Sequence, residues 1–290
     1  CKIWQDLWGY ERMETIIGLG KAGCAIADRF AQYPQYEVYK MDVGLKRSPR
    51  TYGLKIAGSP EEHEDGLGSL KRFFKDVKGH VLFIVGGSGA ISGASLRILE
   101  QVKQCNLHIL YIYADPDLLG ETARMQQRLT LNVLQEYSRS TVFEEVILID
   151  NMRLEEILGD LPIIGFYEKL NELLVPTIHM VNVLSHSESI MGNISAPHPV
   201  SRMVSYGLVD FETGAENLFF NLDNVREKVY YYAINEKKLR TQGDIHKRVI
   251  AQVKANATNT KTTYGIYPTD YDQDYVYCVA YSSRIQENNS

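Results

Sequence analysis

The sequence predicts an α/β fold: a doubly wound, mostly parallel sheet, then a central helix and a smaller α+β domain. Apolar strand-like segments alternate with amphipathic helix-like segments from residue 13 to about residue 185. One of these strands, "HVLFIV" (80–85), is apolar throughout, as expected when both faces of a parallel sheet are covered. The chain after residue 226 changes to a different pattern of strands around one helix, which indicates a second domain.

Periodicity and turn signals give the elements of the first domain in order. We expect strands at 15–20, 36–44, 80–87, 107–115 and 144–151, and helices at 22–32, 64–77, 94–104 and 120–137. Two helix faces are defined by apolar spacing, and both are expected to face the sheet. They consist of Ala25, Ile26 and Phe30 in one helix, and of Met125, Leu129, Val133 and Leu134 in the other.

Residues 165–184 predict a long, largely buried helix. Its wide apolar face is made by Leu170, Leu173, Leu174, Ile178 and Val181. Pro176 should kink this helix, because proline removes a backbone donor and clashes with the preceding turn. Prolines and glycines make 186–226 the least regular part of the chain. A strand at 228–235, a helix at 242–256 and two strands around a polar turn at 263–283 follow.

These elements divide the chain into a first domain at 13–164, a central helix at 165–185 and a C-terminal α+β domain at 186–290. Residues 1–12, "CKIWQDLWGYER", are interpreted as an N-terminal extension, since Met13 directly precedes the first strand.

Composition narrows the function classes. The net charge of −5 argues against a nucleic-acid partner, and no apolar run approaches the length of a membrane-spanning helix. The four cysteines, Cys1, Cys24, Cys105 and Cys278, show no paired spacing, which suits reduced thiols in the cytoplasm. The seven histidines show no HxxxH or HxH spacing, so no transition-metal site is predicted.

The first glycine-rich turn, "GLGKAG", places Gly18, Gly20 and Gly23 between a strand and a helix. Glycines there let backbone N–H groups approach a phosphate at the helix N-terminus. Asp42 ends the second strand, where a dinucleotide-binding fold places a ribose-binding carboxylate. These residues alone allow two hypotheses. The chain is an NAD(P)-dependent oxidoreductase, or its glycines serve only the packing of a strand against a helix.

A second glycine-rich turn, "GGSGAISG" (86–93), follows the third predicted strand. It offers backbone N–H groups from Gly86 to Ala90 and the Ser88 hydroxyl. Two such turns at one edge of a sheet can converge on a single polyphosphate. The oxidoreductase hypothesis leaves this second turn unexplained and finds no obvious catalytic His/Asp or Lys/Tyr pair.

The second turn, followed by a helix, resembles the GGGTGSG-type signature of the tubulin/FtsZ superfamily. Four further segments are similar to that family in the same order along the chain. They are "IIGLGKAGCAIADRF", "YGLKIAGSPEEHEDG", "VILIDNMRLEEIL" and the helix segment "FYEKLNELL". The order and spacing hold from about residue 13 to residue 207, and the last sixty residues fit by pattern only.

The resemblance implies a nucleotide-binding domain that takes GTP or GDP, with Mg²⁺ carried only by the nucleotide. Tyr167 would stack on the guanine and Asn171 would hydrogen-bond its edge; both residues share one helix face. The terminal phosphates would be held by the second turn, through Gly86, Gly87, Ser88, Gly89 and Ala90. The first turn would cover the other side of the phosphates, through Gly18, Gly20, Lys21, Gly23 and Cys24. Glu121 and Arg124 would contact the ribose, and Asn151 would be a further nucleotide contact. Four of these residues also have an interpretation without a nucleotide. Tyr167 would then lie in the core, Asn171 and Lys21 would be solvated, and Asn151 would cap a helix.

The sequence departs from the family at two places. Ile91 stands where the signature has a third glycine, and adds bulk beside the phosphates. In the family, acidic residues of a loop position the water that hydrolyses GTP on the neighbouring subunit. Here that loop reads "NISAPHPVSRMVSYG": Asn193 matches, but Ser195 and His198 stand at the acidic positions. Hydrolysis is therefore expected to be weak or absent.

The leading hypothesis is a guanine-nucleotide-binding protein of the cytoplasm that associates with itself, head to tail, into filaments. It has no membrane partner, and its short form would fit a phage or plasmid protein. The alternative is a structural or assembly protein that kept this fold and binds no nucleotide; Ile91 and the missing acids favour it. An NAD(P)-dependent oxidoreductase is the third hypothesis.

Overall fold

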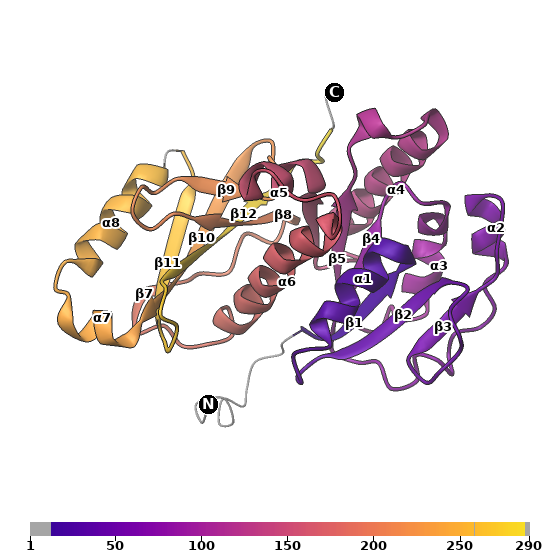
Figure 1. The fold of residues 1–290 in the computed structure, drawn as a ribbon, viewed down its shortest axis with the longest axis horizontal. Helices are drawn as coiled ribbons and strands as arrows, with labels where there is room; N and C mark the ends of the chain where they lie inside the picture. Colours follow the sequence, from indigo (N-terminus) through magenta and orange to yellow (C-terminus); the bar gives the residue numbers. More distant parts are fainter. Residues whose placement is uncertain (1–12, 258, 288–290) are drawn as a thin grey trace. The chain divides into compact units, whose positions relative to one another are not determined.

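The computed structural model describes residues 13–257 and 259–287, so the predicted extension at 1–12 lies outside the described residues. The chain divides into two compact units, and the boundary in the sequence lies between Val175 and Pro176. This boundary lies inside α6 (Phe166–Leu184), which remains helical through Pro176. Figure 1 shows the elements coloured along the chain.

The first unit contains a parallel sheet, as predicted. In the described residues its strand order is β3-β2-β1-β4-β5-β6, and every neighbouring pair is parallel. The strands are β1 (Met13–Leu19), β2 (Glu37–Val43), β3 (Thr51–Leu54), β4 (His80–Gly86), β5 (Asn106–Tyr113) and β6 (Glu145–Asp150). The sequence patterns missed β3, which is short and half-buried throughout.

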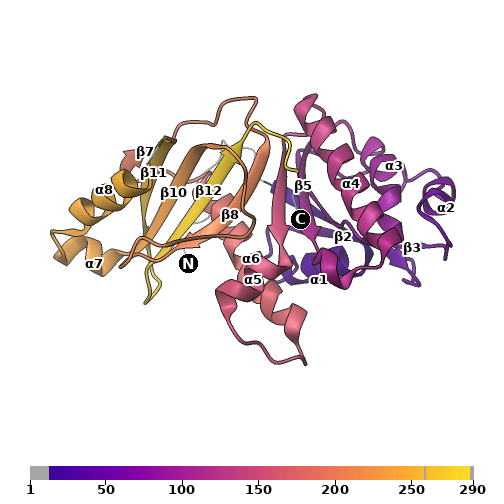
Figure 2. The same ribbon diagram turned by 90° about the horizontal axis from the view of Figure 1, so that it is seen from above.

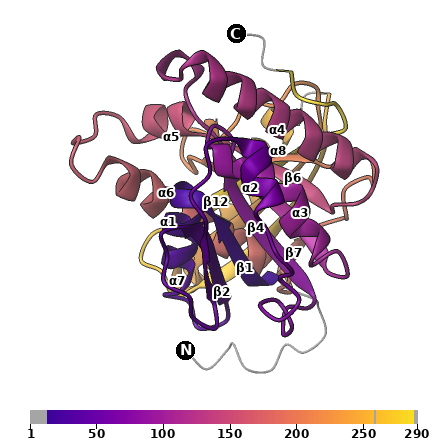
Figure 3. The same cartoon turned by 90° about the vertical axis from the view of Figure 1, so that its right-hand side faces the viewer.

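Helices cover both faces of this sheet. They are α1 (Gly20–Phe30), α2 (Pro60–Asp65), the 3₁₀ helix η1 (Ala90–Ala94), α3 (Ser95–Glu100), the 3₁₀ turn η2 (Pro116–Leu118), α4 (Glu121–Arg139) and α5 (Asn151–Leu158). The chain leaves β1 through α1 toward β2, and leaves β4 through η1 and α3 in the opposite direction, toward β5. Since such crossovers are right-handed, α1 and α3 lie on opposite faces (Figures 2 and 3).

The predicted helix at 64–77 is wrong. The helix there is α2, which begins earlier, after Ser59, whose Oγ accepts a hydrogen bond of 3.2 Å from the N–H of Glu62. It ends at Gly66, and residues 71–76 form turns, although Leu70 and Phe74 are buried. The apolar residues that suggested a helix are buried by a compact loop instead. The predicted helix at 94–104 is likewise shorter, because η1 and α3 end at Glu100.

The predicted sheet-facing sides of two helices need correction. In α4, Leu134 is buried, but Met125, Leu129 and Val133 are 61%, 48% and 37% exposed. The buried side of α4 instead carries Gln127, Thr130, Leu131, Leu134, Gln135 and Ser138. In α1, Ile26 and Phe30 are buried as predicted, whereas Ala25 is exposed. The buried side of α4 is therefore mixed: polar residues share it with Leu131 and Leu134, whereas Met125, Leu129 and Val133 face outward.

The second unit is an α+β domain, as predicted. Its described strands are β7 (Met191–Asn193), β8 (Met203–Val209), β9 (Glu216–Leu218), β10 (Val225–Asn235), β11 (Lys261–Thr269) and β12 (Tyr275–Ser282), ordered β8-β12-β10-β11-β7, with β9 beside β8. β10 pairs in parallel with β11 and antiparallel with β12. The helix predicted at 242–256 is α8 (Ile245–Asn256), and the sequence patterns missed a further short helix, α7 (Glu236–Thr241).

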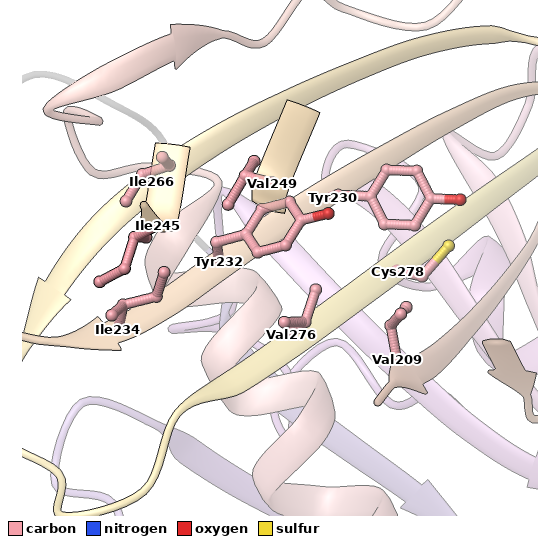
Figure 4. Packing of buried hydrophobic residues seen from close by; sticks show 9 residues of the cluster. All are labelled: Val209, Tyr230, Tyr232, Ile234, Ile245, Val249, Ile266, Val276 and Cys278. Atoms are coloured by element: carbon pink, nitrogen blue, oxygen red, sulfur yellow. The ribbon is translucent and has the colours of Figure 1, made fainter. Parts of the chain in front are cut away.

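A core forms between this sheet and α8. Figure 4 shows Tyr230, Tyr232 and Cys278 from the strands beside Val249 of the helix. The complete cluster is Val209, Tyr230, Tyr232, Ile234, Ile245, Val249, Ile266, Val276 and Cys278. In the described part of the chain, no helix is long and apolar enough to cross a membrane.

His179 of α6 gives the protein a predicted sensitivity to acid. Burial lowers the pKa of His179 from 6.5 to about 4. The unfolded chain therefore binds a proton between pH 6.5 and 4 that the folded chain does not, so stability is lost as the pH falls through this window. The variant His179→Gln should lose less stability than the wild type between pH 7 and pH 4.5, measured by urea unfolding. His246→Gln, which changes an exposed histidine of α8, is the matched control. Equal losses in wild type and His179→Gln would contradict the assignment.

Candidate functional site

The two glycine turns lie side by side at the point where the sheet changes direction. β1 and β4 are neighbouring strands, with Leu19 paired to Val85, yet the chain leaves them toward opposite edges. In open α/β sheets, ligands bind in the crevice outside the carboxyl ends of the strands at such a switch point. The topology therefore puts the two motifs singled out in the sequence at the expected binding position.

The three glycines of the first turn have different roles. Gly20 has a φ of +72°, which favours glycine, and begins α1. A Cβ on Gly23 would lie 2.5 Å from the carbonyl oxygen of Ile84, and one on Gly18 would lie 2.4 Å from that of Gly23. Gly18 and Gly23 are thus required for packing α1 onto β1 and β4, which was the simpler interpretation of the motif. Gly20 alone shapes the open part of the turn.

The side chains beside this turn differ in accessibility. Cys24 is buried, and its thiol donates weak hydrogen bonds to the carbonyl oxygens of Gly18 (3.4 Å) and Met41 (3.6 Å). Burial raises the pKa of Cys24 to about 12. A ligand at the turn could therefore contact Cys24 only through its backbone, whereas Lys21 is exposed. Asp42 accepts a 2.8 Å hydrogen bond from the N–H of Val43.

The second turn is fixed at Gly87 from three directions. Its N–H donates to the carbonyl of Ile112 (3.2 Å), and its own carbonyl accepts from the Ser92 hydroxyl (3.1 Å). A Cβ on Gly87 would lie 1.7 Å from the Tyr111 hydroxyl oxygen, so only glycine fits. In a trans peptide the N–H points opposite to the C=O. The N–H of Ser88 therefore points away from Ser92.

A polar network beneath the second turn was missed from the sequence. The Ser92 hydroxyl, the Thr130 hydroxyl and the Gln126 amide nitrogen lie 3.1 Å from one another. On the same helix, the Gln127 amide bonds the N–H and carbonyl of Ala114, both at 2.9 Å. These side chains explain why α4 turns polar residues toward the sheet. The signal available in the sequence was the set of polar residues that interrupts its apolar spacing.

The two turns contact each other. A Cβ on Gly86 would lie 3.6 Å from the Cβ of Ala22, and a Cβ on Gly20 would lie 2.9 Å from Cγ2 of Ile91. Ile91 itself is half-buried. The turns thus converge as predicted, and the isoleucine side chain lies over Gly20, between them.

The predicted base-contacting residues lie on the first half of α6. Tyr167 is 65% exposed, with its ring edge-on to that of Phe166, so the core interpretation of Tyr167 is wrong. Asn171, one turn later, is half-buried. An ion pair of 3.4 Å between Arg29 and Glu172 ties this half of α6 to α1, the helix that begins at the first glycine turn.

The remaining predicted contacts are accessible. Glu121 and Arg124 are exposed on the first turn of α4, on a helix face that they share with Met125 and Arg128. The carboxylate of Asp150 caps α5 by accepting a 2.9 Å hydrogen bond from the N–H of Met152, so Asn151 is not the cap. Asn151 is half-buried and is the first residue of that helix. Whether these residues contact a nucleotide stays a prediction.

The candidate hydrolysis loop belongs to the second unit. Asn193 ends β7, the Ser195 hydroxyl is buried without a hydrogen-bond partner, and the His198 side chain is exposed. A carboxylate does reach this loop: Glu227 of β10 accepts from the N–H of His198 (2.7 Å). It also accepts from the Ser201 hydroxyl (3.2 Å) and Lys261 (3.1 Å). Glu227 is buried and engaged with these donors, so it holds the loop in shape and is not a free base.

A second polar cluster lies at the opposite, amino ends of the strands. His80 and His108 approach to 3.0 Å between ring nitrogens, and His108 contacts Glu145 at 2.9 Å. In the described residues, no group of three or more His, Cys, Asp or Glu side chains could hold a metal ion. This cluster joins β4, β5 and β6 and takes no part in the candidate site.

The support of the second turn can be tested at Ser92. Ser92→Ala removes the hydroxyl that satisfies the Gly87 carbonyl and leaves buried polar groups without a partner. The free energy of unfolding should fall by about 1–3 kcal/mol, measured from urea denaturation. Ser88→Ala, the same change in the same loop at a half-buried position, should alter stability by less than about 0.5 kcal/mol. An Ser92→Ala protein as stable as Ser88→Ala would show that the network does not hold the loop.

No protein-family model and no curated protein sequence matches this chain. Solved structures do match it closely in fold. An empty FtsZ dimer from M. jannaschii superposes with a TM-score of 0.69 at 14% identity, covering 95% of this chain and 90% of that chain. A GTPγS-form TubZ protofilament from Bacillus thuringiensis serovar israelensis gives 0.68 at 14% identity, covering 95% and 89%. A GTPγS-bound CetZ2 protofilament from Haloferax volcanii gives 0.67 at 12% identity, covering 92% of each chain.

These structures span both units of the chain, including the second unit, which the sequence matched by pattern only. The chain therefore has the fold of the tubulin/FtsZ superfamily, as its five motifs predicted.

Proposed function

We propose that this protein is a guanine-nucleotide-binding subunit that associates with itself, head to tail, into filaments, with weak or absent GTP hydrolysis. The observation that carries the proposal is the convergence of the two glycine turns at the switch point between β1 and β4. A single connection between a strand and a helix needs at most one glycine turn. Two glycine turns in contact offer backbone N–H donors from two directions, which suits a phosphate chain.

The phosphate end of the ligand would be held mainly by backbone. α1 is long enough to direct several unpaired N–H groups toward an anion, and Gly20 opens its first turn. The second turn adds the N–H of Ser88, whose direction is set by the fixed Gly87 peptide. Lys21 is an exposed cation beside the first turn. Mg²⁺ would arrive with the nucleotide, since it is commonly bound by phosphates and water rather than by a protein cage.

The base would be held by α6. A purine needs an aromatic plane and an edge partner with both a donor and an acceptor, which Tyr167 and Asn171 offer on one helix face. The exposure of Tyr167 leaves its ring free to stack. Glu121 and Arg124, which are exposed at the start of α4, are the candidates for the ribose. Asn151, at the end of β6, is a further nucleotide contact in this proposal.

Self-association is supported by the compared structures, which are described as an FtsZ dimer and as TubZ and CetZ2 protofilaments. Head-to-tail contacts join two different surfaces of the subunit and generate open filaments. Weak hydrolysis is supported by the loop at 193–198, which contains no acid, while Glu227 is engaged by other donors. Water near a phosphate would lack a carboxylate to position it.

One observation favours a second candidate, a filament subunit that binds no nucleotide. The Ile91 side chain lies over Gly20, in the space that a phosphate between the two turns would use. In this alternative the fold and its self-association remain, and the glycines serve the packing of α1 and of Tyr111.

The small molecule that co-purifies with the protein distinguishes the two candidate functions. Purified protein is denatured, and the released small molecules are compared with nucleotide standards by ion-exchange chromatography. We expect a guanine nucleotide, and Tyr167→Ala should weaken its rebinding about tenfold through the lost stacking, whereas Tyr167→Phe should not. Tyr275→Ala, which truncates an exposed tyrosine of the second unit, is the matched control. An empty protein that also fails to bind added GTP and GDP would favour the second candidate.

Assembly and hydrolysis are tested together by light scattering and phosphate release. We expect scattering to rise with protein concentration while phosphate release stays near the background. The Ser195→Asp and His198→Asp variants return an acid to the loop and should increase release without abolishing assembly. Fast release by the wild type that grows with protein concentration would contradict weak hydrolysis, and scattering that never rises would contradict self-association.

A further inference from the structure

The Ile91 side chain lies between the two glycine turns, on the side of Gly20. Its Cγ2 lies 2.9 Å from where a Cβ of Gly20 would stand and 3.7 Å from where a Cβ of Gly89 would stand. The isoleucine thus touches the opening residue of one turn and the preceding part of its own turn. Hydrocarbon therefore lies where the two turns, which form the cup, approach each other at Gly20.

The backbone that carries Ile91 is anchored on both sides. Before it, Gly87 is fixed by Ile112, Ser92 and Tyr111. After it, Gly93 packs so closely on α2 that a Cβ there would lie 2.6 Å from Cβ of Pro60. The Ser92 N–H also donates to the carbonyl of Gly89 at 2.9 Å, which closes the 3₁₀ turn around Ile91. A ligand cannot push this segment aside without breaking these contacts.

The side chain itself has little freedom to rotate away. Isoleucine is branched at Cβ, and in a helical backbone such residues strongly prefer one χ1 rotamer. Ile91 lies in η1, whose backbone is helical, and it is half-buried. The cup therefore keeps a methyl group over Gly20 instead of opening to admit a larger anion.

A phosphoryl group beside Ile91 would be at a disadvantage in charge as well as in space. The isoleucine side chain and a phosphoryl group have similar numbers of heavy atoms, so they compete for one volume. Isoleucine offers no hydrogen-bond donor, and an anion desolvated against hydrocarbon without donors is strongly disfavoured. A shorter phosphate chain avoids this contact and keeps the backbone donors of α1 and of Ser88.

We infer that Ile91 takes the place of one phosphoryl group, so that the site selects GDP over GTP. This inference rests on the proposed guanine-nucleotide site. A subunit that holds a diphosphate has no γ-phosphate to cleave. It therefore needs no acid at Ser195 or His198 to position a water molecule. Both departures from the family pattern, Ile91 and the acid-free loop, would then follow from the binding of GDP. Assembly would proceed with GDP bound.

The test compares the affinities of GDP and GTP for the full chain by isothermal titration calorimetry, with Mg²⁺ present. In the wild type, GDP should bind at least about tenfold more tightly than GTP. Ile91→Gly should bring GTP to within about threefold of GDP while changing the affinity for GDP by less than about threefold. Ile91→Ala, which keeps backbone rigidity, is measured in parallel in case the glycine variant does not fold. Ile190→Gly, an exposed isoleucine of the second unit, is the matched control.

Each outcome separates this inference from the proposed function. A wild type that binds GTP as tightly as GDP, or variants that leave the ratio unchanged, would overturn the inference while the guanine site stands. A wild type that binds neither nucleotide, with Ile91→Gly or Ile91→Ala binding GTP, would overturn the selection of GDP and would instead support the nucleotide-free candidate, with Ile91 as the group that excludes the nucleotide. Failure of the wild type and both folded variants to bind either nucleotide would overturn the inference and the proposed function together.

Discussion

The close packing of α1 on the sheet is the constraint on which the candidate site depends. Gly23 lies so near the carbonyl of Ile84 that no larger residue fits, and Gly18 and Gly23 meet with similar closeness. This contact joins the helix after β1 to the strand that ends in the second glycine turn. Because the chain leaves β1 and β4 in opposite directions, nothing in the connectivity covers the space outside their ends. Convergence of the turns is thus a consequence of strand order and of small residues at two positions.

Convergence alone does not decide what the turns hold. Backbone N–H groups at the cup favour an anion, whereas the methyl group of Ile91 favours a small one or none. The loop at 193–198, which contains no acid, lies in the other compact unit and is distant in sequence from both turns. The acid-free loop and the methyl group of Ile91 both fit the proposal that this protein does not cleave a terminal phosphate. Tyr167 is exposed on the helix that an ion pair ties to α1, which is the placement that the proposed base contact requires.

The sequence predicted the parallel strands well and the helices less well. Strands such as 80–86 are buried on both faces, so a continuous apolar run identifies them without any knowledge of their neighbours. The helix expected at 64–77 failed because Phe74 and Leu70 are buried by a loop, and periodicity cannot distinguish the two cases. The alternative that Asn151 caps α5 is wrong by one position, because Asp150 is the cap and both residue types are good caps. The glycine turns were found because their chemistry is local. Glu227 was not, because it meets its loop only through the pairing of distant strands.

The mixed buried side of α4 shows how a site requirement can modify the usual apolar pattern. The second turn needs a donor at the Gly87 carbonyl, and Ser92 supplies it only while Thr130 and Gln126 hold its hydroxyl. Those residues must face inward, and hydrogen bonds satisfy them there, so burial of polar groups is tolerated. The apolar residues that would normally occupy these positions are then left outside, where Leu129 and Val133 line a small groove over Ser92 and Thr130. The inward positions of Gln126 and Thr130 therefore serve the support of the second turn, while Leu131 and Leu134 supply the apolar part of the buried side.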